Sequence, residues 1–106
     1  MPAPDLSVVI PVCNEQDNVV PLAREIAAAL AGRQFEVVFV DDGSTDATVD
    51  RLRGLRAEIP QLRVLLHSRR SGQSYAVASG VRAARAEWVA TLDGDGQNDP
   101  ADIPAL

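Results

Sequence analysis

Lysine is absent from this sequence, and cysteine, histidine and aromatic residues are scarce. All ten basic residues are arginine, and the chain has one cysteine (Cys13), one histidine (His67) and 4% aromatic residues. The absence of lysine rules out a Walker-type phosphate-binding loop and argues against an enzyme that forms a Schiff base with its substrate. One cysteine cannot form an internal disulfide bond, and one cysteine with one histidine cannot complete a structural zinc site.

Long apolar runs and a basic leader are also missing. No apolar run approaches the roughly 20 residues that cross a bilayer, and residues 1–5 lack the basic segment of a secretory signal. The formal net charge is -5, which makes a poor nucleic-acid surface because basic contacts to phosphate supply most of that affinity. We therefore expect a cytoplasmic chain that binds no nucleic acid, with any membrane association supplied by parts outside this sequence.

The length of 106 residues suits one domain. A chain of this size buries roughly two-thirds of its unfolded surface, which is enough for one core. It is too short for the two-domain body of most enzymes that process sugars or nucleotides. After Asp99-Pro100 the sequence begins what looks like another helix without a closing element. We expect residues 1–106 to be a single domain from a longer protein.

Four short runs rich in Val, Ile, Leu and Phe predict β-strands. They are continuous rather than alternating, which is typical of strands covered on both faces of a parallel sheet. The runs are Leu6 to Val12, Phe35 to Val40, Leu62 to Leu66, and Trp88 to Leu92.

Apolar residues at helical spacing predict three helices between these strands. The helices run from an Asn18 cap to Leu30, from a Ser44 or Thr45 cap to Pro60, and from Gln73 to Arg85. Small residues in the third helix, including Ala76 and Gly80, imply that it lies close to the sheet. Alternating strands and helices with short connections predict an α/β fold, a Rossmann-like three-layer α/β/α arrangement with a mainly parallel sheet.

Polar residues follow all four predicted strands, where ligands bind in open α/β sheets. The four segments are Asn14-Glu15, Asp41-Asp42-Gly43-Ser44, His67-Ser68-Arg69-Arg70, and Asp93-Gly94-Asp95-Gly96-Gln97-Asn98-Asp99. Three of these segments carry carboxylates, which repel one another unless a cation or hydrogen-bond donors offset their charge. The pattern predicts a binding site along this edge of the sheet.

Asp93 and Asp95 are the candidate metal ligands. They stand two residues apart on a glycine-flanked turn, and Mg²⁺ or Mn²⁺ favours carboxylate and phosphate oxygens. An ordinary acidic turn is the alternative. The position of the pair after a fourth strand, with carboxylates after two other strands, favours the metal.

Asp41 and Asp42 are candidates for nucleotide binding, because acidic groups at such a strand end commonly accept hydrogen bonds from a ribose or base. A turn followed by a helix cap is the alternative. Arg69 and Arg70 precede Gly72 and a helix, so they could meet a diphosphate, although a solvated basic pair is at least as good an interpretation. We expect His67 to be structural or superficial and Cys13 to be a packing residue.

With these motifs in place, the chain resembles the N-terminal half of a family 2 glycosyltransferase, the inverting type with a GT-A nucleotide-sugar domain. The resemblance rests on four segments in order: Ser7 to Glu15, Val40 to Thr48, Gly72 to Ala76 with Gly80, and Thr91 to Pro100. The last segment is similar to the dolichyl- or polyprenyl-phosphate sugar transferase branch. Cys13 stands where this family often has an aromatic residue, and Arg70-Ser71 replaces a commoner asparagine and apolar residue.

The resemblance implies a set of site residues. The base and ribose of a nucleotide sugar would lie among Pro11, Cys13, Glu15, Asp41 and Asp42. Further contacts to the nucleotide sugar would come from Arg70, Gly72, Asp93 and Gly94. Asp93 and Asp95 would be the catalytic pair that meets the metal and the diphosphate, and Gln97 could also meet the metal.

The implied reaction is metal-dependent, inverting transfer of a sugar from a GDP- or UDP-sugar to a polyprenyl or dolichyl phosphate, at the cytoplasmic face of a membrane. A phosphate acceptor is already ionised near pH 7 and needs no general base. A transferase that extends a polysaccharide or glycan, and a non-catalytic nucleotide-binding module, remain alternatives. We expect this chain alone to be inactive, and its sheet edge could pair with a second copy.

Overall fold

The computed structural model describes residues 3–92, so predictions for residues 93–106 lie outside the described part. Strands and helices alternate along it: β1 (Leu6–Val12), α1 (Val19–Ala29), β2 (Phe35–Asp42), α2 (Thr48–Gly54), β3 (Leu62–His67), α3 (Gln73–Ala83) and β4 (Trp88–Thr91). The strands form one parallel sheet in the order β3-β2-β1-β4. None of the described helices is long and apolar enough to cross a membrane.

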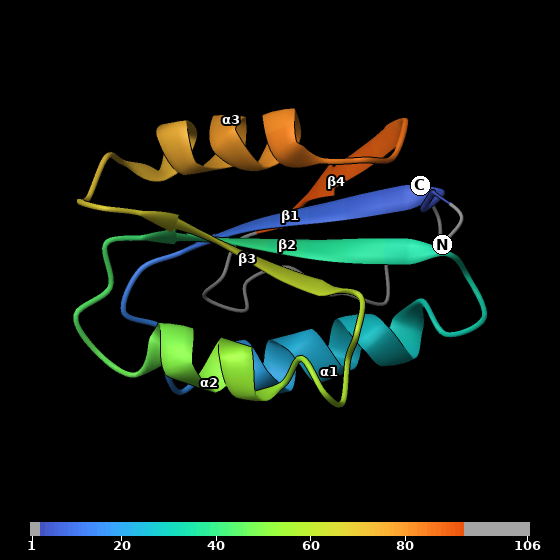
Figure 1. Cartoon of the computed structure of the whole chain (residues 1–106), viewed down its shortest axis with the longest axis horizontal. Helices are drawn as coiled ribbons and strands as arrows, with labels where there is room; N and C mark the ends of the chain where they lie inside the picture. The colour runs from blue at the N-terminus through green and yellow to red at the C-terminus, as the bar shows by residue number, and fades with distance from the viewer. Residues whose placement is uncertain (1–2, 93–106) are drawn as a thin grey trace.

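The sheet lies between two helical layers (Figure 1). Helix α3 covers one face, and helices α1 and α2 cover the other. This arrangement confirms the predicted three-layer α/β/α fold. Successive parallel strands start at the same edge of the sheet, so the chain must cross back between them. Each helix provides that crossing over one face of the sheet.

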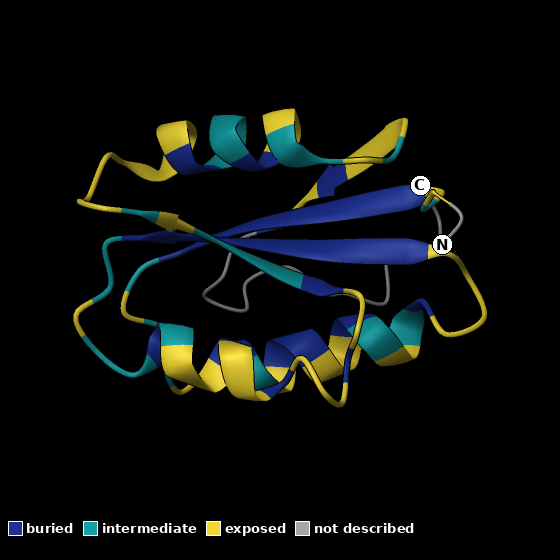
Figure 2. Cartoon of the chain, in the orientation of Figure 1, coloured by how far each residue is buried: buried dark blue, intermediate teal, exposed yellow. Residues whose placement is uncertain are grey.

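Strands β1 and β2 form the centre of the sheet and are buried along their whole length (Figure 2). Side chains alternate between the two faces of a strand. Val8 and Ile10 therefore join the core beneath α1 and α2, whereas Val9 and Val38 join a smaller core beneath α3. The continuous apolar runs in the sequence follow from these two cores.

The same prediction of burial on both faces is wrong for the outer strands. Most of β3 is only half-buried, and three of the four β4 residues are exposed, including Trp88 at 71%. Within the described sheet, each of these strands has a neighbour on one side only. Short apolar runs do not distinguish an outer strand from a central one.

Helix α1 begins and ends close to its predicted bounds. Val19, Leu22, Ala23 and Ile26 are buried on one side, and Gly32 turns the chain with a φ of 87°. Asn18 is the N-cap residue, as predicted, but its side chain does not cap the helix. Its amide donates instead to Glu15 Oε2 at 2.7 Å.

Helix α2 differs from its prediction. It starts at Thr48 with Ala47 as N-cap, so neither Ser44 nor Thr45 caps it. The Ser44 hydroxyl donates to Asp41, and the Thr45 N–H donates to the Asn14 side chain. The helix ends at Gly54, and the rest of the predicted span to Pro60 is not helical. The cap prediction fails because both residues are engaged by the neighbouring loops.

Helix α3 packs closely on β1 and β2, as its small residues predict. A Cβ on Gly80 would overlap the Val9 side chain and stand 3.0 Å from Val40 Cγ2. The helix ends at Ala83, two residues before the predicted Arg85, because Ala84 is extended with a ψ of 138°. The Arg85 N–H then donates to the Glu36 carboxylate at 2.6 Å.

Candidate functional site

Three loops meet at the carboxyl edge of the sheet, at the left of Figure 1. Residues 13–18 connect β1 to α1, residues 43–47 connect β2 to α2, and residues 68–72 connect β3 to α3. Because the strands are parallel and adjacent, these loops begin side by side. The register pairs Val12 with Asp41, and Asp42 with His67.

Asn14 joins the first two loops. Its side-chain oxygen accepts the N–H groups of Thr45 at 2.8 Å and Asp46 at 3.3 Å, and its own N–H donates to Ser44 Oγ at 2.8 Å. Asn14 also has a φ of 54°, which asparagine tolerates better than most residues. The sequence interpretation missed this role, although asparagine is a residue that favours turns through side-chain bonds to the backbone.

Asp46 and Thr48 strengthen the same junction, and both were missed as well. Glu15 N–H donates to Thr48 Oγ1 at 2.9 Å, and the Asp46 carboxylate accepts the Thr48 N–H at 2.9 Å. The Thr48 hydroxyl, followed by backbone hydrogen bonds, lowers the pKa of Asp46 despite some burial. The loops at this edge are therefore held by side-chain bonds to backbone groups, which fix the loop shape without a regular ladder.

Asp41 and Asp42 are both buried, with 3% and 5% of their surface exposed. They point to opposite faces of the sheet because they are adjacent in β2. Asp41 accepts the Ser44 N–H at 3.0 Å and the Ser44 hydroxyl. It therefore ties the end of β2 to the following loop.

Asp42 holds the third loop. Its two oxygens accept the N–H groups of Ser71 and Gly72, each at 2.8 Å, and Oδ1 lies 3.0 Å from His67 Nδ1. Burial alone would raise the pKa of Asp42, but the hydrogen bonds from His67, Ser71 and Gly72 together lower it. The carboxylate is thus held in its charged form at the edge of the sheet.

The third loop also passes directly over the second. A Cβ on Gly43 would stand 2.8 Å from Arg70 N and 3.1 Å from the Arg69 carbonyl carbon, and Gly43 has a φ of 79°. Only glycine fits such a position without strain. The sequence Asp41-Asp42-Gly43 thus brings the β3–α3 loop against the carboxyl end of β2.

The structure brings most of the predicted nucleotide-site residues to this one edge. Asp41 and Asp42 end β2, Cys13 and Glu15 follow β1, and Arg70 and Gly72 precede α3. Pro11 lies buried within β1, paired with Val40. Cys13 and Glu15 are half-buried, and Arg70 is exposed.

The predicted metal and catalytic residues Asp93 and Asp95 lie outside the described residues, as do Gly94 and Gln97. Within residues 3–92, no three His, Cys, Asp or Glu side chains are grouped closely enough to hold a metal ion. The prediction of a metal site at Asp93 and Asp95 therefore stays a prediction.

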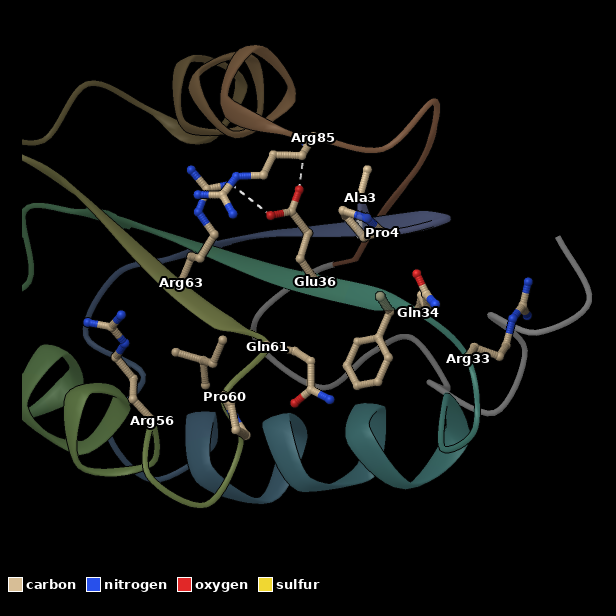
Figure 3. A pocket seen from close by; sticks show the side chains of 12 residues that line it. Ala3, Pro4, Arg33, Gln34, Glu36, Arg56, Pro60, Gln61, Arg63 and Arg85 are labelled. Atoms are coloured by element: carbon tan, nitrogen blue, oxygen red, sulfur yellow. Dashed lines mark hydrogen bonds and ion pairs between the residues drawn. The ribbon is translucent and has the colours of Figure 1, made fainter. Parts of the chain in front are cut away.

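A second polar cluster lies at the opposite, amino edge of the sheet, and sequence reasoning missed it (Figure 3). Glu36 accepts hydrogen bonds from Ser7 Oγ at 2.6 Å, Arg85 N at 2.6 Å and Arg63 Nη1 at 2.7 Å. Ser7 Oγ in turn accepts the Ala86 N–H at 3.1 Å. The signal was Glu36, a single charged residue inside the apolar run from Phe35 to Val40.

The environment of Glu36 stabilises its charge. Burial by itself would raise the pKa of Glu36, whereas the bonds from Ser7, Arg85 and Arg63 together lower it. A pocket of about 610 Å³ opens beside the cluster and is lined in part by Arg33, Arg56 and Arg85. Because it stands at the amino ends of the strands, this pocket is separate from the loops that carry the predicted nucleotide site.

Sequence comparison finds similar proteins over nearly the whole chain. A family model described as "Glycosyl transferase family 2" matches residues 7–106. The chain is 43% identical over 105 residues to a dodecaprenyl-phosphate galacturonate synthase from Rhizobium johnstonii. It is 44% identical over 105 residues to an undecaprenyl-phosphate 4-deoxy-4-formamido-L-arabinose transferase from Edwardsiella ictaluri. These alignments cover 96% and 95% of the chain but only 31% and 32% of the relatives, so the chain spans about a third of their length.

Comparison with solved structures also finds similar proteins. The fold is similar to the mannosyltransferase PcManGT from Pyrobaculum calidifontis in complex with GDP-Man and Mn²⁺, with a TM-score of 0.83 and 27% identity. It is also similar to S. aureus TarS 1-349 in complex with UDP-GlcNAc, with a TM-score of 0.78 and 29% identity. The matches cover 98% and 86% of this chain, and 31% and 26% of those chains.

Proposed function

Because the chain belongs to glycosyl transferase family 2, we propose that its protein transfers a sugar from a nucleotide-diphosphate sugar to a polyprenyl phosphate. The observation that carries this proposal is the identity of 43% and 44% to two transferases whose names specify dodecaprenyl and undecaprenyl phosphate. Residues 1–106 would form the domain that binds the nucleotide sugar. Solved relatives with bound GDP-Man and UDP-GlcNAc support that part of the proposal.

The carboxyl edge of the sheet supplies the residues for nucleotide binding in this proposal. Cys13, Glu15, Asp41 and Asp42 would surround the base and ribose, with Pro11 in β1 beneath them. Arg70 and Gly72 would lie towards the diphosphate. The support from the structure is that these loops are already tied together by Asn14, Asp42 and Gly43, so little conformational freedom would be lost on binding.

The proposed reaction is metal-dependent. Asp93, Asp95 and Gln97 would hold Mg²⁺ or Mn²⁺, and Asp93 and Gly94 would also approach the donor. The metal supplies positive charge that offsets the charge developing on the departing nucleoside diphosphate. The structural relative PcManGT was solved with Mn²⁺, which supports this choice of cation. The residues of this chain would bind the donor and orient its anomeric carbon towards the acceptor.

The acceptor would be a lipid phosphate presented at the cytoplasmic face of a membrane. Its phosphate is largely ionised near pH 7, so it can attack the anomeric carbon from the opposite face without a general base. In this proposal the acceptor site lies outside the nucleotide-binding domain, and residues 1–106 alone would bind donor without transferring sugar. A transferase that extends a glycan would need a general base for its hydroxyl acceptor.

Calorimetric titration tests the donor site directly. GDP and UDP are titrated into the 106-residue chain and into the whole protein, with and without Mn²⁺, and again into Asp95→Asn. We expect metal-dependent binding that the substitution abolishes, and the preferred nucleotide narrows the identity of the donor. Binding by the whole protein but not by the chain would contradict a self-sufficient nucleotide domain. No binding by either would contradict the proposed function.

The acceptor is tested separately, with a radiolabelled sugar donor whose base is the one that binds. The whole protein is offered undecaprenyl phosphate or a soluble glycan. We expect label to enter the lipid phosphate fraction only. Label in the glycan would favour the glycan-extending alternative.

A further inference from the structure

His67 makes two hydrogen bonds that none of the roles discussed so far requires. Its Nδ1 lies 3.0 Å from Asp42 Oδ1, and its Nε2 lies 2.9 Å from Ser79 Oγ. Asp42 and His67 are register partners on β2 and β3, and Ser79 lies on α3. The side chain of His67 is only 17% exposed. The ring therefore bridges the sheet and the helix that covers it.

The partners of the ring determine where its proton lies. The charged Asp42 carboxylate can only accept, so His67 Nδ1 must carry hydrogen. In neutral imidazole the other nitrogen is then an acceptor, and it accepts a hydrogen bond from the Ser79 hydroxyl. Ser79 Oγ also accepts from Arg82 Nη2 at 3.5 Å, which leaves its own hydrogen for the ring. The series of hydrogen bonds from Ser79 through His67 to Asp42 thus has one consistent set of donors and acceptors.

This chain of bonds ends at the loop that precedes α3. The same Asp42 carboxylate accepts the N–H groups of Ser71 and Gly72, each at 2.8 Å. Gly72 has a φ of 101° and immediately precedes the first residue of α3. A carboxylate with free rotation could not hold both N–H groups at once. His67 bonds the same Oδ1 that accepts the Ser71 N–H, and the bond to Ser79 holds the ring in turn, so the ring restricts rotation of the carboxylate.

We propose that His67 is a positioning residue for nucleotide binding, which sets the orientation of Asp42 and thereby the position of the Ser71–Gly72 backbone. The inference rests on the proposed function, in which Asp42 and Gly72 meet the nucleotide sugar. It adds a residue that does not itself touch the ligand. Without His67, the carboxylate rotates and the β3–α3 loop leaves its binding position.

Two amide substitutions separate the two bonds of the ring. The amide nitrogen of an asparagine stands near the position of imidazole Nδ1, so His67→Asn keeps the donor to Asp42. The longer glutamine places its amide near Nε2, so His67→Gln keeps the contact to Ser79 and loses the one to Asp42. In the whole protein with Mn²⁺, we expect the Kd of the preferred nucleotide to rise about tenfold in His67→Gln, the equivalent of about 1.4 kcal/mol. His67→Asn should stay within about twofold of wild type, an equivalent of about 0.4 kcal/mol.

Ser7→Ala is the matched control for lost stability. It removes a buried hydroxyl that bonds Glu36 at the opposite edge of the sheet, so it should lower the thermal midpoint without changing the Kd. Amide hydrogen exchange at Ser71 and Gly72 provides a readout without nucleotide, and should become faster in His67→Gln but not in His67→Asn. An unchanged Kd and unchanged exchange in His67→Gln would overturn the inference while leaving the proposed function intact. Failure of the wild-type protein to bind nucleotide would overturn the proposed function, and this inference with it.

Discussion

At the scale of single residues, two buried carboxylates of β2 connect several parts of the fold. Glu36 and Asp42 both lie on the α3 face of β2, at opposite ends of the strand. Glu36 is bonded to β1, to β3 and to the segment after α3, and Asp42 is bonded to β3 and to the loop before α3. Each carboxylate therefore adds directional bonds that fix a strand or loop relative to β2, which non-directional apolar contacts alone do not do. Asp42 stands at the end that carries the candidate nucleotide site, and Glu36 at the end beside the second pocket.

Glu36 gives a prediction about acid stability. Its pKa is lowered in the folded protein, so its contribution is fully present above the ordinary value of 4.5 and is lost as the pH falls through the lowered value. Glu36→Gln would place an amide where Arg63 and the Arg85 N–H require an acceptor. We expect it to lower the free energy of unfolding at pH 7 by about 2 kcal/mol, the usual cost of an unsatisfied buried polar group.

Chemical denaturation between pH 3 and pH 7 measures this effect. The loss of stability on acidification should be smaller in Glu36→Gln than in wild type, because one titrating group is gone. Glu58→Gln is the matched control, since Glu58 also pairs with an arginine, Arg24, but both side chains are about half exposed. It should change stability little. Equal effects of the two substitutions would refute a special role for the buried carboxylate.

At the scale of elements, the position of α3 depends on one missing side chain. Gly80 lets the helix approach β1 and β2 until a Cβ would overlap Val9. Gly80→Ala gains up to about 1 kcal/mol of helix propensity, but overpacking of this kind costs about 1–3 kcal/mol and needs a shift of the helix. We expect net destabilisation and weaker nucleotide binding, because α3 carries Ser79 and follows the Gly72 loop.

Gly54→Ala is the comparison for this prediction. Gly54 ends α2, is exposed and has no atom within 4 Å of an added Cβ. It should therefore show the propensity gain alone and raise the midpoint of thermal unfolding, while Gly80→Ala lowers it. A stabilised Gly80→Ala protein would show that the helix can move away from the sheet without cost.

The helices and strands also show which features of the fold can be predicted from the sequence. Apolar runs and helical spacing predicted all four described strands, all three described helices and the close approach of α3, because these features depend on local periodicity. The cap of α2 and the role of Asn14 could not be predicted in the same way. They depend on which loop lies beside which, and that is decided by strand order and register rather than by the residues nearby.

In the candidate site, too, features set by the local sequence could be predicted, and contacts set by strand order and register could not. Residue type and strand-end position were enough to select Asp41, Asp42 and Gly72, which the fold brings to one edge. The sequence did not reveal that both carboxylates would be buried and bonded to loop N–H groups. The sequence predicted that His67 is structural or superficial; its bonds to Asp42 and Ser79 fit the structural alternative, but the sequence did not identify those partners. Partners that are distant in sequence can be identified only when the register of the strands is known, and here the register pairs Asp42 with His67.

At the scale of the whole molecule, the described sheet has two unlike edges. Strand β3 borders it on one side and β4 on the other, and β4 exposes 71% of Trp88 and 37% of Val89. An exposed edge strand offers unpaired N–H and C=O groups to another chain. Trp88 adds an aromatic surface that favours burial beside it. The formal net charge of -5 is modest, because ten basic side chains offset most of the fifteen acidic ones. Electrostatic repulsion between two copies therefore opposes association only weakly.

We therefore expect a polypeptide of residues 1–106 to self-associate through β4. Sedimentation velocity over a range of concentrations should show a rising mean mass for the wild type. Trp88→Lys should shift the mass towards monomer, because lysine on an edge strand discourages pairing. Tyr75→Lys adds the same charge and removes an aromatic side chain that is 65% exposed on α3, away from the sheet edge. It should leave association unchanged if the edge is responsible. Equal loss in both variants would point to non-specific apolar contact, and a wild type that stays monomeric at every concentration would contradict pairing through β4.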